Sequence, residues 1–215
     1  ARRPEAGISL NFISDRLHYN QFSPAPNNGR AAGPPTVGKF DGAHKRKSIF
    51  LVGPQVHLVT GQPVNDRSGV RLNYTVDFAD ITQATEGEGA RVYKWPFDPN
   101  RVTSNHGNDF PIFRLAEMYL IKAEAANELG RPAEAVGLMN TIRERVFDPD
   151  EPLSAGLSQD AVRTAMLDER LFELMDEAKR RADLIRHGRW TAAGYEKEQQ
   201  DPYRVLMPIP QTQLD

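Results

Sequence analysis

The chain changes character at Pro111, and this change constrains its fold more than any other feature. Of its 16 glycines and 16 prolines, 11 glycines and nine prolines lie before Pro111. They gather in clusters, such as residues 24–29 and 32–35, that break helices and set turns. After Pro111 the sequence has long stretches with helical spacing. We therefore expect a loop-rich region over residues 1–110 and a helical region over residues 111–215, packed together as one domain.

The first region contains three short candidates for extended structure. Residues 48–52 form an apolar run, residues 70–76 alternate apolar and polar side chains, and residues 90–95 form a third candidate. Alternation of this kind is typical of a half-buried strand. The pattern predicts small β-hairpins between ordered loops rather than a large sheet.

The second region has three segments in which apolar residues recur every three or four positions, over residues 112–129, 132–146 and 159–187. Gly130 suits the C-terminal stop of the first helix, and Ser158 is a good N-cap for the third. A link of about two residues predicts antiparallel packing of the first two helices. The fold class is therefore predicted to be mainly α, with tetratricopeptide-like helical hairpins, long loops and small β-hairpin decorations.

Two finer expectations concern how the helical region packs. The inner face of the first helix is expected to include Leu115, Tyr119, Ala126 and Leu129. The tail over residues 205–210 is apolar but locked by prolines, so it is expected to pack as an extended strap.

Composition excludes several classes of protein. Lys and Arg number 27 and Asp and Glu 29, so the net charge of −2 lacks the basic footprint of a nucleic-acid binder. The absence of cysteine excludes disulfide scaffolds and thiolate metal sites. The five histidines are scattered, and no catalytic motif or phosphate-binding glycine loop is present. We predict no enzyme activity, no metal and no cofactor.

The densest charge pattern lies over residues 169–186. Glu169 and Glu173 are one helical turn apart, and a glycosidase could use such a pair of carboxylates. Arginines interleave with them at helical spacing, which keeps carboxylates charged, whereas a general acid needs the opposite shift. A structural network of salt bridges is the interpretation that we favour.

Four segments together resemble the SusD/RagB family of nutrient-binding outer-membrane lipoproteins from Bacteroidota-type bacteria. Residues 113–125 (FRLAEMYLIKAEA) look like its signature helix, and residues 169–188 resemble its E-R-x-x-E-L-x-x-E-G-x-R-x-x-D-L-x-R-x-G pattern. Residues 207–211 (MPIPQ) and residues 40–46 are similar to two further family segments. Ala178 stands where the family usually has glycine, and Arg181 and His187 replace frequent aromatic residues. The structural motif positions are Arg114, Glu117, Glu124, Glu169, Arg170, Glu173, Arg180, Asp183 and Arg186.

The resemblance implies a helical protein at the cell surface, held at the outer membrane by a lipid anchor on an N-terminal part that this sequence does not contain. It implies capture of an oligosaccharide, or sometimes a peptide, and transfer to a SusC-like TonB-dependent transporter. A helical-repeat adaptor that binds only protein and a helical glycoside hydrolase remain the competing interpretations.

A glycan-binding protein needs aromatic rings for sugar faces and amide groups for hydroxyls, often on loops. The loop-rich region offers Tyr93 and Trp95, which alternation would place on one face. Covering the helical core is the other role open to this pair. The candidate ligand contacts are Tyr74, Tyr93, Trp95 and Asn108, with Asn100 and Asn105 nearby in sequence.

Overall fold

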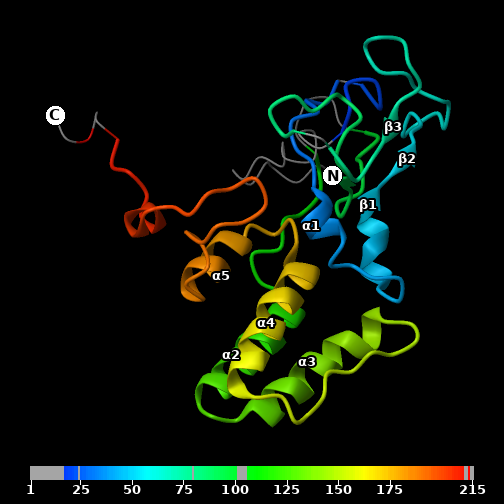
Figure 1. The fold of residues 1–215 in the computed structure, drawn as a ribbon. Coiled ribbons are helices and arrows are strands. Elements are labelled where there is room, and N and C mark those ends of the chain that lie inside the picture. The colour runs from blue at the N-terminus through cyan, green and yellow to red at the C-terminus, as the bar shows by residue number, and fades with distance from the viewer. Residues whose placement is uncertain (1–16, 24, 79, 101–105, 211–212, 214–215) are drawn as a thin grey trace. The chain divides into compact units, whose positions relative to one another are not determined.

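A computed structural model describes residues 17–23, 25–78, 80–100, 106–210 and 213 (Figure 1). The chain forms two compact units. The first comprises residues 1–112 and 146–149, and the second comprises residues 113–145 and 150–215.

The first unit consists mainly of ordered loops joined by short paired segments. It has a short helix α1 (Pro34–Val37) and a 3-10 helix (Lys45–Ile49). Strand β1 (Phe50–Leu51) pairs antiparallel with β4 (Arg91–Val92), and β2 (Gly53–Pro54) pairs antiparallel with β3 (Asn73–Tyr74). The predicted extended segments therefore contain β1, β3 and β4. The expected small antiparallel pairs are present. Both strand pairs join segments far apart in the sequence, and the antiparallel bridge between Asn65 and Arg71 closes a tighter turn.

The second unit is built from helices whose apolar faces meet in one core. They are α2 (Leu115–Glu128), α3 (Pro132–Val146, whose last residue belongs to the first unit), α4 (Gln159–Leu174) and α5 (Arg180–Arg186). Leu120, Ala123, Met139, Val162 and Met166 are among the buried residues of this core. These helices confirm the mainly α fold class, and Figure 1 shows α3 running back from the turn after α2.

The sequence signals for helix ends agree with the structure. Gly130 adopts φ +75°, and the Arg131 N–H donates to the Ala126 carbonyl at 2.9 Å, which closes α2 with a glycine cap. At the start of α4 the Ser158 side chain accepts a hydrogen bond from the Ala161 N–H. The end of α2 and the start of α4 are therefore each fixed by hydrogen bonds between residues close in sequence.

The single helix expected over residues 159–187 is in fact two helices. The chain turns after Leu174, and Asp176 and Ala178 adopt φ values of +71° and +58°. Arg170 and Asp183 would lie about 20 Å apart along a continuous helix, yet their side chains form an ion pair of 2.9 Å. The turn thus folds α5 back against α4.

Two packing expectations were also wrong. Leu115 and Leu129 are 73% and 70% exposed, because the core side of α2 is the side of Leu120, Ala123 and Ala126. The tail does not pack as a strap either, since Leu206, Met207 and Ile209 are all exposed.

The turn at Ala178 leads to a stability prediction. The left-handed conformation costs an L-residue about 1–2 kcal/mol, whereas glycine costs about 0.5–1 kcal/mol in unfolded-state entropy. Because Ala178 is exposed and contributes little packing, Ala178→Gly should raise the free energy of unfolding by about 0.5–1 kcal/mol. Chemical denaturation measures this change.

Ala182 provides the matched control, because it is an exposed alanine inside α5. Ala182→Gly should shift stability in the opposite direction, by about 0.5–1 kcal/mol. Destabilisation by both substitutions would show that the Ala178 conformation is not strained.

Candidate functional site

The loop after β4 carries three of the predicted ligand contacts. Tyr93 and Trp95 are half-buried, and the Tyr93 hydroxyl accepts a hydrogen bond of 2.8 Å from the Phe97 N–H. The Trp95 ring lies 5.9 Å from the Phe110 ring, at an interplanar angle of 32°. Asn108 donates from its side-chain amide to the Pro96 carbonyl at 3.2 Å. The structure therefore brings Tyr93, Trp95 and Asn108 together around the loop that begins at Pro96.

Of the two other asparagines, Asn100 is exposed and its N–H donates to the Asp98 carboxylate at 2.9 Å. Asn105 lies outside the described residues. The role of these side chains in ligand binding stays a prediction.

Tyr74 is not a surface residue, which corrects the expectation that it contacts a ligand. Its side chain is fully buried, its hydroxyl donates to the Gln21 side chain, and the His18 N–H donates to that hydroxyl at 3.0 Å. The Arg91 guanidinium lies over its ring, 4.6 Å from the centroid. Burial raises the pKa of Tyr74 to about 12. A sugar has no access to this ring.

Glu86 joins this buried polar cluster to the surface. Its carboxylate accepts hydrogen bonds from the Arg67 N–H at 3.0 Å and the Arg67 guanidinium, and lies 2.8 Å from the His18 ring. Burial by itself raises the pKa of Glu86, but these hydrogen bonds outweigh it and lower the pKa to about 2 from 4.5.

Because its pKa is lower in the folded state, Glu86 stabilises the protein above about pH 4.5, and this contribution is lost as the pH falls toward 2. We expect the melting temperature to fall across this window, and to fall less steeply in Glu86→Gln. Thermal melts at several pH values measure both slopes. Identical slopes would contradict the assignment, and Asp77→Asn, at an exposed carboxylate in the same unit, controls for general charge effects.

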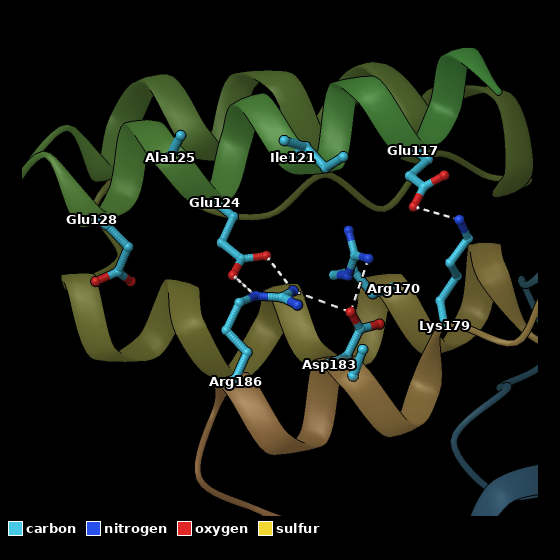
Figure 2. Close-up of a pocket in the computed structure, with 10 residues that line it drawn as sticks. Glu117, Ile121, Glu124, Ala125, Glu128, Arg170, Lys179, Asp183 and Arg186 are labelled. Atoms are coloured by element: carbon cyan, nitrogen blue, oxygen red, sulfur yellow. Dashed lines mark hydrogen bonds and ion pairs between the residues drawn. The ribbon is translucent and has the colours of Figure 1, made fainter. Parts of the chain in front are cut away.

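Helices α2 and α5 border a hollow in the second unit (Figure 2). Its volume is about 440 Å³. Glu117 on α2 pairs with Lys179 at 3.0 Å, and Glu124 on α2 pairs with Arg186, whose guanidinium also contacts Asp183 at 3.1 Å. The other lining residues are Ile121, Ala125, Glu128, Arg170 and Ala182.

Three further carboxylates of the second unit, Glu169, Glu173 and Glu177, are buried and held by arginines. Arg114, which precedes α2, donates to the Glu173 carboxylate at 2.6 Å and to the Glu177 carboxylate at 2.7 Å. Burial opposes the charge on Arg114, but the hydrogen bonds to the two glutamates raise its pKa above the ordinary value. Glu169 pairs with Arg143 at 3.0 Å.

Arg180 also has a structural contact, since it donates to the Leu167 carbonyl at 2.6 Å and so ties α5 to α4. The interleaved charges of residues 169–186 are thus contacts between elements. Sequence spacing could not identify Arg114, Arg143 and Lys179 as partners, because they come from distant parts of the chain.

Two features of the described residues concern metal binding and membrane spanning. In the described part of the chain, no group of three or more His, Cys, Asp or Glu side chains is placed to hold a metal ion. Among the same residues, every helix is too short or too polar to cross a membrane.

The chain is similar in sequence to known SusD-like proteins. SusD-like protein P25 of Formosa agariphila is 38% identical over 134 residues, which cover 58% of this chain and 25% of P25. The starch-binding protein SusD of Bacteroides thetaiotaomicron is 36% identical over 121 residues, covering 53% of this chain and 20% of that protein. The chain thus spans about a quarter of the length of these relatives.

A solved structure shares the fold. A SusD-like carbohydrate binding protein from Bacteroides vulgatus matches with a TM-score of 0.50 and 19% identity, over 82% of this chain and 31% of that protein. The family model described as the SusD family matches residues 62–215. That match covers most of the sequence and includes every structural motif position from Arg114 to Arg186, so the chain belongs to the SusD family.

Proposed function

We propose that this chain is part of a cell-surface nutrient-binding protein that captures an oligosaccharide and does not cleave it. The observation that carries the proposal is the family match over residues 62–215. The names of two similar proteins, one starch-binding and one carbohydrate binding, support the same ligand class. The motif carboxylates Glu169 and Glu173 are paired with arginines, which suits a scaffold better than acid catalysis.

Within the described residues, Tyr93, Trp95 and Asn108 form the ligand contact that we propose. A half-buried indole offers an apolar face for the C–H side of a sugar ring, and the nearby amide offers hydrogen bonds to hydroxyls. The Trp95 ring already packs beside Phe110 before any ligand binds, which lowers the ordering cost of such a contact.

Removing the Trp95 ring tests the contact. Trp95→Ala should weaken oligosaccharide binding by about 1–3 kcal/mol, by analogy with ring stacking on nucleic-acid bases. Calorimetry with a panel of oligosaccharides measures the change, and an unchanged melting temperature shows that the fold is intact. Tyr195→Ala is the matched control, because Tyr195 is a half-exposed aromatic residue in the second unit.

A fluorescence experiment gives an independent readout. The chain has two tryptophans, so in Trp190→Phe the emission reports on Trp95. A sugar that stacks on this ring should change that emission. Undiminished affinity in Trp95→Ala would contradict the proposed ligand contact. Binding of a protein partner without any glycan would favour the helical-repeat adaptor. Release of sugar products from a polysaccharide would favour the glycoside hydrolase.

We further propose that the whole protein is lipid-anchored at the outer membrane and passes its ligand to a SusC-like TonB-dependent transporter. This proposal rests on the family alone. Purification of the whole protein from native outer membranes should co-purify the transporter, and repeated purification without it would count against the proposal.

A further inference from the structure

Arg67 lies in the turn over residues 66–69 of the first unit, and its guanidinium is held in one orientation. The Nε–H group donates to one oxygen of the Glu86 carboxylate, and the other oxygen accepts the Arg67 backbone N–H at 3.0 Å. The guanidinium also lies over the Tyr19 ring, 4.5 Å from its centroid. An ion pair and a stacking contact therefore fix a side chain that is 64% exposed.

A buried polar network supports this arrangement. Glu86 Oε2 lies 2.8 Å from Nε2 of His18, which is fully buried. The Glu86 carbonyl accepts hydrogen bonds from Arg91 at 2.8 Å and from Asn28 at 3.1 Å. Buried polar groups are costly unless they are paired, and a fully paired network is rigid. The network thus fixes Glu86, and Glu86 in turn fixes Arg67.

The turn is held in place as well. The Asp66 carboxylate accepts the Ser68 N–H at 2.9 Å, and the side-chain amide of Asn20 donates to the Asn65 carbonyl at 2.7 Å. Asn20 follows Tyr19 in the sequence, so this hydrogen bond joins the turn to the segment that carries the stacked ring. An exposed salt bridge alone contributes little to stability. Stability therefore does not explain why so many contacts converge on Arg67.

The outer edge of the Arg67 guanidinium offers donors to a ligand. Glu86 uses only Nε, so among the described residues the N–H groups on Nη1 and Nη2 have no partner. The planar fork of a guanidinium matches the two oxygens of a carboxylate. Because Arg67 is already oriented, such a ligand would meet donors that need little further ordering.

We propose that Arg67 binds the carboxylate of a uronic acid unit, so that the captured oligosaccharide is an acidic one. The proposal rests on the proposed function and names its substrate class. Glu86 and Tyr19 position the guanidinium, and the exposed Asn20 lies beside Tyr19 in the sequence, where its amide can reach sugar hydroxyls. Since Glu86 already balances the charge of Arg67, recognition depends on the two-oxygen geometry of the ligand as well as on its charge.

A panel of uronate oligosaccharides of several linkages, each compared with its carboxyl-reduced counterpart, tests the substrate class. The two forms share rings and linkages and differ in the carboxylate. By calorimetry, at least one acidic member should bind about ten- to a hundredfold more tightly than its reduced form. Arg67→Gln should abolish this preference, and Arg67→Lys should restore only part of it, because an ammonium lacks the planar fork.

Lys39→Gln is the matched control, since it also removes one positive charge from an exposed side chain of the first unit and should keep the preference. Equal melting temperatures of Arg67→Gln and Lys39→Gln show that the fold is intact. Glucuronate alone gives a second readout, because it should shift the ¹⁵N signal of Arg67 Nε while glucose at the same concentration should not.

The outcomes separate this proposal from the proposed function. Equal binding of acidic and reduced forms, or a preference that persists in Arg67→Gln, overturns the assignment of Arg67 and leaves oligosaccharide capture standing. Absence of binding to every oligosaccharide of both forms contradicts oligosaccharide capture itself, and the acidic substrate class with it.

Discussion

Asp183→Ala should lower the free energy of unfolding by about 3–5 kcal/mol, the cost of removing one partner from a buried ion pair. Asp183 is 1% exposed and contacts Arg170, which is 4% exposed, at 2.9 Å. In the described part of the chain Asp183 is the only carboxylate paired with Arg170. The substitution therefore leaves a buried guanidinium without its counter-charge, and urea denaturation measures the loss.

Two variants make the Asp183 result interpretable. Asp183→Asn keeps the shape and one acceptor oxygen, so it should cost less than alanine while still removing the charge. Glu134→Ala is the matched control, because its pair with Arg131 is exposed and should contribute less than about 1 kcal/mol. Loss of glycan binding in Asp183→Ala with unchanged stability would instead place this residue in a ligand site.

The helices of the second unit could be predicted because their signals are local. Apolar spacing located α2, α3 and α4, and the caps at Gly130 and Ser158 fixed two of their ends. The break before α5 has no cap residue of its own, since the residues around Asp176 and Ala178 are ordinary in a helix. The one cue was that Ala178 stands where the family usually has glycine, which suits its positive φ. The break depends on contacts such as Arg170 with Asp183, which become visible only in three dimensions.

The error at Tyr74 has a different cause. Alternation over residues 70–76 correctly placed Leu72 and Tyr74 on one buried face, with Asn73 and Thr75 exposed. The same pattern therefore already argued against Tyr74 as a ligand contact. Its position in a loop-rich region suggested a ligand contact, whereas the alternation of the segment places the Tyr74 side chain on the buried face.

Exposure of Leu115 and Leu129 shows a limit of periodicity in an alanine-rich helix. Apolar residues surround most of α2, so the pattern predicts a helix without indicating which face meets the core. Small alanines at Ala123 and Ala126 mark the core side, because they permit close approach of α4. The larger apolar residues Leu115 and Leu129 lie on the exposed side of the helix.

Arg114→Ala should destabilise the protein by about 3 kcal/mol, the lower end of the cost for a buried pair, because Arg114 bridges two buried carboxylates and Glu173 keeps a second arginine, Arg145, at 2.8 Å. Glu173 and Glu177 are 4% and 1% exposed, and Arg114 contacts them at 2.6 and 2.7 Å through different nitrogens. It also donates to the Glu173 carbonyl. This one side chain thus joins the start of α2 to the end of α4, and chemical denaturation should show the loss.

Arg114→Lys should recover only part of this stability, since a single ammonium cannot reproduce the planar fork that reaches both carboxylates. Arg131→Ala, which breaks an exposed pair with Glu134, is the control and should change stability by less than about 1 kcal/mol. Equal stability of Arg114→Ala and Arg131→Ala would refute the role of Arg114. Full recovery by lysine would show that charge alone matters, whereas the two-nitrogen geometry predicts that the shape of the guanidinium contributes as well.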